Sequence, residues 1–522
     1  MSPSRCVVGL LEQCSSMREM KQIHGHAITH GLARFAFISS KLLAFYARSD
    51  LHYAHTLFSH IPFPNLFDYN TIITAFSPHY SSLFFIQMLN AAVSPNSRTF
   101  SLLLSKSSPS LPFLHQLHSH IIRRGHVSDF YVITSLLAAY SNHGSTRAAR
   151  RLFDQSPYKN VACWTSLVTG YCNNGLVNDA RNLFDAIPER ERNDVSYSAM
   201  VSGYVKNGCF REGIQLFREL KDRNVKPNNS LLASVLSACA SVGAFEEGKG
   251  IHSYVDQNKS QCYYELELGT ALIDFYTKCG CVEPAQRVFG NMKTKDVAAW
   301  SAMVLGLAIN AKNQEALELF EEMEKVGPRP NAVTFIGVLT ACNHKDLFGE
   351  ALKLFGYMSD KYGIVASIEH YGCVVDVLAR SGKIEEALEF IKSMEVEPDG
   401  VIWGSLLNGC FLHNNIELGH KVGKHLVELE PGHGGRYVLL SNVYATMGKW
   451  EAVLETRKFM KDRGVPAVSG SSFIEIHQTV HKFLVHDNNH HCGSYPAEVY
   501  RVLNHLGNKL EDYSKSHEII VF

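Results

Sequence analysis

The chain has 522 residues, 46% hydrophobic and 19% charged, a composition that excludes a collagen-like or wholly disordered protein. Its 50 basic and 50 acidic residues cancel, so no overall positive field indicates a nucleic-acid partner, although this balance is compatible with a local basic groove. No apolar run approaches the length of a membrane span, and the 13 cysteines are scattered without a CxxC pair. We therefore expect reduced thiols and no membrane partner.

A short motif recurs along the chain, in which Ala or Gly is followed four residues later by Phe. Neighbouring copies lie 31 to 35 residues apart where they follow one another directly. The motif ends at Phe58, Phe153, Phe184, Phe217, Phe289, Phe320 and Phe355. Upstream of it lies an apolar segment that opens with an aromatic and a small polar residue, as at Tyr69, Trp164, Tyr197 and Trp300.

Each unit is predicted to consist of a helix, a short Gly-containing turn, a second helix and a loop that often contains Pro-Asn. Two helices cannot bury their apolar faces alone, so neighbouring units must stack. The predicted fold is all-α: a right-handed superhelical α-solenoid of helix-turn-helix repeats.

The unit length varies, with values such as 31, 33, 35 and 36 residues, whereas a tetratricopeptide array has 34 residues per repeat. This variation and the motifs resemble the pentatricopeptide repeat proteins of land plants, in the subgroup that mixes P-, L- and S-type repeats. The S-type resemblance is close after Thr134 and Gly269, and the L-type after Ser234 and Gly337. The N-terminal third fits least well, because the unit at 66–96 is short and the next lacks the usual Cys and Gly positions.

The resemblance divides the chain into an L-like repeat at 1–35, a repeat array at 36–399, an E motif at 400–468 and an E+-like tail at 469–522. Within the array the units are 36–65, 66–96, 97–129, 130–160, 161–193, 194–228, 229–265, 266–296, 297–331, 332–367 and 368–399.

The resemblance also implies that each S or P unit reads one RNA base with two side chains, one early in the first helix and one that closes the unit. The implied pairs are Ser40/Asn65, Asn70/Asn96, Thr134/Asn160, Thr165/Asn193, Ser198/Asn228, Thr270/Asp296 and Ser301/Asn331. Family rules then predict 5′-A, C, gap, A, A, A, gap, G, A-3′ on single-stranded RNA. The alternative is that these residues are only helix caps and loop residues, which Ser, Thr and Asn favour in any protein.

Other chemistry-bearing residues favour structural roles. His24, His118 and His252 occupy equivalent places in three L units, which indicates repeat anchors rather than a ligand cluster. Cys14, Cys239, Cys342 and Cys410 share an LxxC frame typical of core packing. Seven histidines gather in the tail without a zinc-binding spacing, so we expect no metal and no cofactor.

The C-terminal extension resembles the E motifs that follow the repeats in organellar editing factors. The stretch from Ser472 alternates apolar and polar residues and predicts a short β-hairpin. Many relatives continue with a cytidine-deaminase-like DYW domain, which needs an H-x-E pair and a CxxC. Here Cys492 is the last cysteine and no CxxC occurs, so we expect no deaminase and no enzymatic activity.

The resemblance therefore predicts an organellar RNA-binding factor that specifies C-to-U editing sites and recruits a deaminase-bearing partner in trans. A splicing or RNA-stabilising factor is the alternative within RNA binding, and a protein-interaction scaffold is the alternative from another class. Mitochondrion is the first expectation for location and chloroplast the second, by family habit rather than from a recognisable leader.

Overall fold

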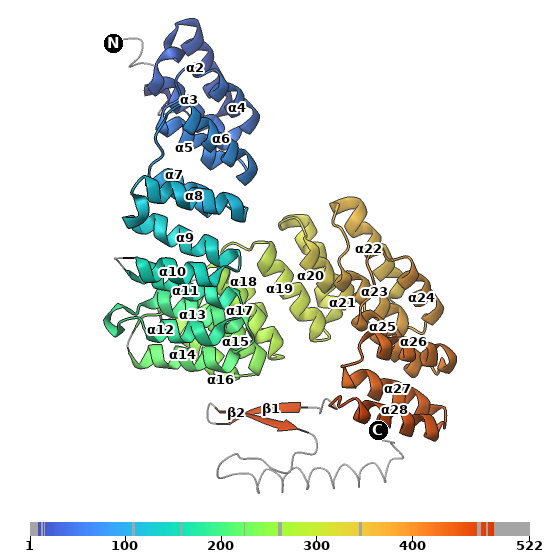
Figure 1. The fold of residues 1–522 in the computed structure, drawn as a ribbon. Coiled ribbons are helices and arrows are strands. Elements are labelled where there is room, and N and C mark those ends of the chain that lie inside the picture. The colour runs from blue at the N-terminus through green and yellow to red at the C-terminus, as the bar shows by residue number, and fades with distance from the viewer. Residues whose placement is uncertain are drawn as a thin grey trace. The chain divides into compact units, whose positions relative to one another are not determined.

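The computed structural model describes residues 9–11, 14, 16–106, 110–156, 159–223, 225–258, 264–343 and 347–466, and the backbone of 471–476 and 479–484. The chain divides into two compact units, Met1–Leu231 and Leu232–Phe522. Helices follow one another along both units (Figure 1). The first unit contains α2 (Met17–Thr29), η1 (Leu32–Arg34, a 3-10 helix like η2 and η3), α3 (Ala36–Ser49), α4 (Leu51–Ser59), α5 (Leu66–Ala75), α6 (Pro78–Asn90), α7 (Ser97–Ser105), α8 (Leu111–Arg123), η2 (His126–Ser128), α9 (Phe130–Asn142), α10 (Thr146–Gln155), α11 (Val161–Asn173), α12 (Val177–Asp185), η3 (Glu189–Glu191), α13 (Asp194–Lys206) and α14 (Phe210–Asp222).

The second unit continues the same pattern and adds a hairpin. Its helices are α15 (Asn229–Val242, which begins just before the boundary), α16 (Phe245–Asn258), α17 (Leu266–Lys278), α18 (Val282–Gly290), α19 (Val297–Ile309), α20 (Asn313–Val326), α21 (Ala332–Ala341), α22 (Phe348–Tyr362), α23 (Ile368–Arg380), α24 (Ile384–Lys392), α25 (Gly400–Leu412), α26 (Ile416–Leu429), α27 (Gly434–Thr446) and α28 (Trp450–Asp462). The strands β1 (Ser471–Ile476) and β2 (Thr479–Leu484) pair antiparallel, with Ser471 opposite Leu484, which confirms the predicted hairpin.

The helices pack as a two-layered stack, which confirms the α-solenoid. The first helix of each repeat contacts the first helix of the next, as in the series α5, α7, α9, α11, α13 and the series α17, α19, α21, α23, α25. Each second helix packs mainly on its own first helix and on the first helix that follows. One layer therefore consists of first helices in direct contact, and the second helices cover it.

The recurring Phe motif and the aromatic residue that opens the next first helix are two halves of one contact. Phe153 and Trp164 have ring centroids 4.5 Å apart, Phe184 and Tyr197 5.1 Å, and the pair planes are steeply inclined. The same contact joins Phe58 to Tyr69, Phe289 to Trp300, and Phe320 to Phe335. Edge-to-face rings are a favourable arrangement for buried aromatics. The two sequence motifs thus mark the joint between consecutive repeats.

A second recurring contact joins the ends of neighbouring first helices. In α13, Gly203 lies so close to Cys172 of α11 that an added Cβ would come within 2.2 Å of its sulfur. Four residues on, Asn207 donates through Nδ2 to the backbone oxygens of Cys172 (2.9 Å) and Gly203 (2.8 Å). We call this glycine and asparagine the Gly–Asn clasp. It recurs as Gly170 with Asn174 and as Gly306 with Asn310.

The anchor histidines and the LxxC cysteines behave as predicted where the structure describes them. A ring nitrogen of His118 lies 2.8 Å from the hydroxyl of Tyr140, and one of His252 lies 2.6 Å from that of Tyr276, in the unit that follows each. His24 contacts Tyr53 in the same way at 3.3 Å. Cys239, Cys342 and Cys410 are buried and Cys14 is half-buried. Burial raises the pKa of Cys342 to about 12, so this thiol stays protonated.

Candidate nucleic-acid interface

The seven residues that close the predicted reading units occupy one position in the fold, directly before the first residue of a first helix. Their side-chain oxygen accepts a hydrogen bond from the backbone N–H at the third helical position. These bonds reach Asp68 from Asn65, Thr99 from Asn96, Cys163 from Asn160, Ser196 from Asn193, Leu231 from Asn228, Ala299 from Asp296 and Thr334 from Asn331. All seven are therefore helix caps.

Capping also determines which atoms of these side chains face away from the helix. Because a backbone N–H must be met by an oxygen, the amide of each capping Asn directs Oδ1 toward the helix and leaves Nδ2 to donate elsewhere. At Asp296 the same arrangement leaves a second carboxylate oxygen, which accepts only. The cap and reading interpretations are thus compatible, since capping orients the group that a base would meet.

The other members of the pairs also share one position, the fifth residue of a first helix. Three pairs are in direct contact: Ser198 Oγ donates to Asn228 Oδ1 at 3.0 Å, Ser301 Oγ donates to Asn331 Oδ1 at 3.3 Å, and Asn65 Nδ2 donates to Ser40 Oγ at 3.3 Å. The structure therefore brings together residues about 30 positions apart in the sequence.

Two further pairs are joined through the third residue of the following first helix. Thr99 Oγ1 lies 2.8 Å from Asn70 Oδ1 and 3.0 Å from Asn96 Oδ1. Thr134 Oγ1 lies 3.6 Å from the sulfur of Cys163, whose N–H is capped by Asn160. In the part of the chain that the structure describes, no hydrogen bond joins the remaining pairs, Thr165 with Asn193 and Thr270 with Asp296. Thr165 instead donates to the backbone oxygen of Val161 at 2.9 Å.

A groove of 390 Å³ lies along the first helices α9, α11 and α13 and the start of α15, within the first unit. Thr165 and Ser198 line it, together with small polar residues such as Ser202, Asn173 and Ser230. None of its lining residues is charged. Its hydroxyl and amide groups match the donors and acceptors on base edges rather than a phosphate.

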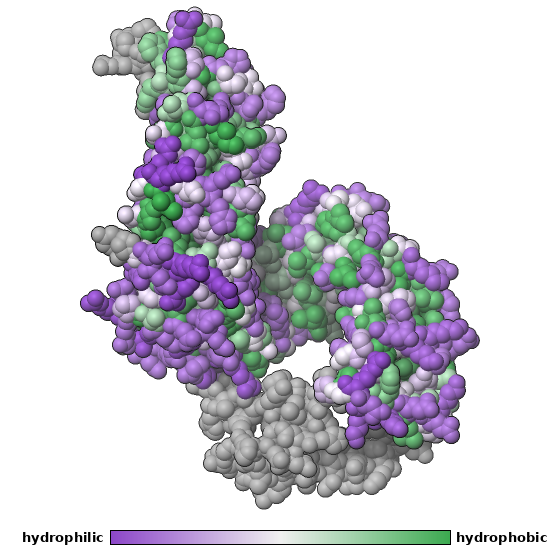
Figure 2. All heavy atoms as spheres, viewed as in Figure 1, coloured by the Kyte–Doolittle hydropathy of each residue, from purple (hydrophilic) through white to green (hydrophobic). Residues whose placement is uncertain are grey.

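The sequence interpretation missed a set of exposed apolar residues beside the caps. Each is the second residue of a first helix, and the exposed fraction runs from 46% at Val333 to 65% at Tyr131. The set comprises Phe37, Phe67, Tyr131, Val195, Val333 and Val401. On the face seen in Figure 2, hydrophobic patches are interspersed among hydrophilic ones. Apolar and aromatic surface of this kind suits stacking against bases. The periodic spacing was visible in the sequence, but exposure at a capped helix start was not.

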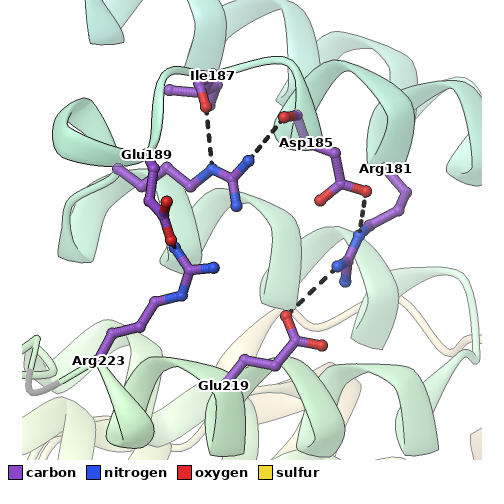
Figure 3. A network of polar contacts seen from close by, with 7 residues as sticks. Arg181, Asp185, Ile187, Glu189, Glu219 and Arg223 are labelled. Atoms are coloured by element: carbon purple, nitrogen blue, oxygen red, sulfur yellow. Dashed lines mark hydrogen bonds and ion pairs between the residues drawn. The ribbon is translucent and has the colours of Figure 1, made fainter.

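Three arginines in and after α12 and after α14 bond to other groups of the protein (Figure 3). Arg181 pairs with Asp185 at 2.8 Å and with Glu219 of α14 at 3.4 Å, and Arg223 pairs with Glu189 at 2.7 Å. Arg192 donates to the backbone oxygens of Ile187 and Asp185. Arg181 and Arg223 thus link two repeats to each other, whereas Arg192 bonds within its own repeat.

Among the described residues, no group of three or more His, Cys, Asp or Glu side chains is placed to hold a metal ion, and none of the helices described is long and apolar enough to cross a membrane. The seven tail histidines lie outside the residues whose side chains are described.

Family models match the chain in several places. A model described as the PPR repeat family matches 192–241 and 295–344, PPR repeat models match 159–187, 270–297 and 369–397, and a model of the E motif matches 413–475. A pentatricopeptide repeat-containing protein of Arabidopsis thaliana is 44% identical over 490 residues, which cover 92% of this chain and 78% of the relative. The chain belongs to the pentatricopeptide repeat family.

Other relatives of this pentatricopeptide repeat protein agree. A second Arabidopsis protein is 42% identical over 93% of this chain and 79% of its own length, and ELI1, whose name marks it as chloroplastic, is 38% identical over 99% and 81%. The solved structure of PPR10 in complex with an 18-nt psaJ RNA element has 14% identity, a TM-score of 0.52, and covers 88% of this chain and 78% of PPR10. At this identity the likeness supports the fold.

Proposed function

We propose that this pentatricopeptide repeat protein binds single-stranded organellar RNA in a sequence-specific manner and specifies sites of C-to-U editing. In this proposal it is a member of the P-, L- and S-type class with E and E+ motifs, and a partner supplies the deaminase in trans. It acts as a recognition factor rather than as an enzyme.

The observation that carries the proposal is the recurrence of one polar arrangement in seven repeats. In each, a fifth-position hydroxyl or amide lies on the same layer of first helices as a capping Asn or Asp of fixed orientation. A scaffold for proteins has no need for this combination at regular intervals, whereas a single strand offers one base edge per step. The E motif at 413–475 supports the editing role within RNA binding.

Base recognition is tested first with the full chain and the RNA 5′-ACNAAANGA-3′, in which each N faces an L unit. Asp296 presents an acceptor and Asn at this position presents a donor, so Asp296→Asn is expected to shift the preference at the eighth nucleotide from G to A. Affinities for the two RNAs are compared by fluorescence anisotropy, with Asn331→Ala as a control that acts on the ninth nucleotide. An unchanged preference at the eighth nucleotide contradicts the assignment of bases to repeats.

Editing is tested by comparing cytidine editing across organellar transcripts with and without this protein. The purified chain alone is expected to bind RNA and leave cytidine intact. Binding without any editing change favours a splicing or stabilising role. A fluorescent fusion tests the location, for which we propose the mitochondrion, with the chloroplast as the alternative that two relatives' names support.

The role of the tail is tested with a chain that ends after Pro466. A cut after Asp399 is unsuitable, because the core that includes Leu378 and Ile391 continues without interruption into Leu406 and Leu426. A chain ending at Pro466 retains this core and the one around Tyr437. We expect it to bind RNA normally and to lose editing. Full editing by this shortened chain rejects a recruiting role for the tail.

A further inference from the structure

The first predicted reading pair, Ser40 with Asn65, contains a buried carboxylate that the pairwise scheme does not include. Asp68, the third residue of α5, has no exposed surface. Its Oδ1 accepts from Ser40 Oγ at 2.5 Å and its Oδ2 accepts from the backbone N–H of Asn65 at 2.9 Å. Burial raises the pKa of Asp68, and the two hydrogen bonds act in the opposite direction. Asp68 is therefore hydrogen-bonded to both members of the pair, just as the two members are hydrogen-bonded to each other.

These bonds use most of the hydrogen-bonding capacity of the pair. Ser40 has one hydroxyl proton, and it donates this proton in a hydrogen bond to Asp68. Asn65 Oδ1 accepts from the backbone N–H groups of Phe67 (2.8 Å) and Asp68 (3.2 Å), and one proton of Nδ2 goes to Ser40. What is left for a base is one lone pair on Ser40 and one proton on Asn65.

A matched site exists in the second unit, where Ser301 pairs with Asn331. The residue equivalent to Asp68 is Thr334, whose Oγ1 lies 2.7 Å from Ser301 Oγ. Either hydroxyl can be the donor in this contact, since Thr334 Oγ1 also donates to Asn331 Oδ1 at 3.0 Å and Ser301 also reaches Asn331 Oδ1 at 3.3 Å. Both acceptors of the Ser301 proton are neutral, so turning this proton toward a base breaks only a hydrogen bond between neutral groups. A hydrogen bond to a buried carboxylate is roughly twice as strong as one between neutral groups, so the proton of Ser40 stays where it is.

We propose that Asp68 is a positioning residue that makes the Ser40–Asn65 pair stricter than the Ser301–Asn331 pair, by holding the hydroxyl of Ser40 as an acceptor only. This inference rests on the proposed RNA-binding function. Donor and acceptor are interchanged between adenine or cytosine and guanine or uracil on the edge that pairs. When Ser40 can only accept and Asn65 Nδ2 can only donate, the pair matches one of these two classes of base. When the serine hydroxyl can rotate, as at Ser301, the pair can match bases of both classes. Two pairs that both consist of Ser and Asn therefore differ in base selectivity because the third residue is Asp68 in one and Thr334 in the other.

The test uses the full chain, its variants Asp68→Thr and Thr334→Asp, and the RNA 5′-ACNAAANGA-3′ with A or G at the first or the ninth nucleotide. For the unmodified protein we expect a preference for A over G of roughly tenfold at the first nucleotide, the size of one good hydrogen bond. Asp68→Thr is expected to reduce it to about twofold, and Thr334→Asp to raise the preference at the ninth nucleotide by roughly fivefold.

The readout is a ratio of two affinities measured on one protein, so a smaller folded fraction does not change it. Should Asp68→Thr fail to fold, as judged by circular dichroism, the reciprocal variant Thr334→Asp decides alone. Unchanged ratios in folded variants that bind RNA overturn the role of Asp68 and leave the proposed function intact. Absence of RNA binding by the unmodified protein overturns the proposed function itself, and this inference with it.

Discussion

Two stretches of the first unit end their first helices in different ways. In α11 and α13 the Gly–Asn clasp joins each helix to the one before, and the turn that follows uses Gly175 or Gly208 with φ near +75°. In α5 there is no such glycine. Ser81 of α6 donates to the backbone oxygen of Ile73 at 2.9 Å, and Lys106, just after α7, donates to that of Phe76.

The difference shows what a repeat needs at this joint. The carbonyls at the end of a first helix require donors, because they lie against the neighbouring repeat. A glycine allows two first helices to approach so closely that one asparagine donates hydrogen bonds to a carbonyl of each helix. In α5, which lacks this glycine, the ring centroids of Phe76 and Phe84 are 5.4 Å apart, and Ser81 and Lys106 supply the donors. Donors from other side chains thus take the place of the clasp at the end of α5.

The largest effect is expected when a side chain is placed at the glycine of the Gly–Asn clasp. In Gly203→Ala the new Cβ meets the Cβ of Cys172 at 2.7 Å as well as its sulfur, so the helices must separate. We expect a loss of about 1–3 kcal/mol in the free energy of unfolding, measured by urea denaturation. Gly25→Ala in α2, where a Cβ meets nothing within 4 Å, is the control and is expected to be neutral or slightly stabilising. Equal losses at the two sites contradict the clasp.

A second pair of variants removes the donors from each stretch. Asn207→Ala removes two part-buried side-chain hydrogen bonds, to carbonyls that each keep a backbone donor, and is expected to cost about 1–2 kcal/mol. Lys106→Ala removes one donor at a half-buried site, where water replaces it, and is expected to cost less than about 1 kcal/mol. A larger loss at Lys106 than at Asn207, in the same urea titration, argues that the compensating contacts carry more of the stability.

The smallest effect concerns pH, which separates α11 and α13 from the histidine-containing helices α2 and α8 of the same unit. Burial lowers the pKa of His24 and of His118 below 6.5, and the repeats at 161–228 contain no histidine. Below pH 6.5 the unfolded chain binds protons that the folded chain does not, so stability near these histidines rises with pH and falls as pH drops through this range. We expect hydrogen exchange in α2 and α8 to speed up at pH 5.5 relative to pH 7.5, after correction for intrinsic rates, and exchange in α11 and α13 to stay constant. Uniform change across all four helices contradicts this.

Much of the fold was predictable from local pattern. The spacing of Ala and Phe marked the buried side of the second helices, and the aromatic residues marked the start of the first helices, because a helix repeats its face every three to four residues. The pair residues came from the family resemblance rather than from periodicity, and the structure places them at two constant positions, the fifth residue of a first helix and the residue just before one. The capping role of Asn65 or Asn331 was visible in residue type alone.

The contacts across repeats were not predictable in this way. The pair Ser198 and Asn228 meets at 3.0 Å, while in the described structure Thr270 and Asp296 have no hydrogen bond between them, although both pairs occupy the same two positions of their repeats. The sequence by itself determined the repeats, their order and the polar character of the layer they share, because these follow from periodicity within one helix. Only the tertiary structure decided which side chains across that layer touch, and that Asp68 enters the first pair, because such contacts depend on how closely two helices approach and on which atoms their caps leave free.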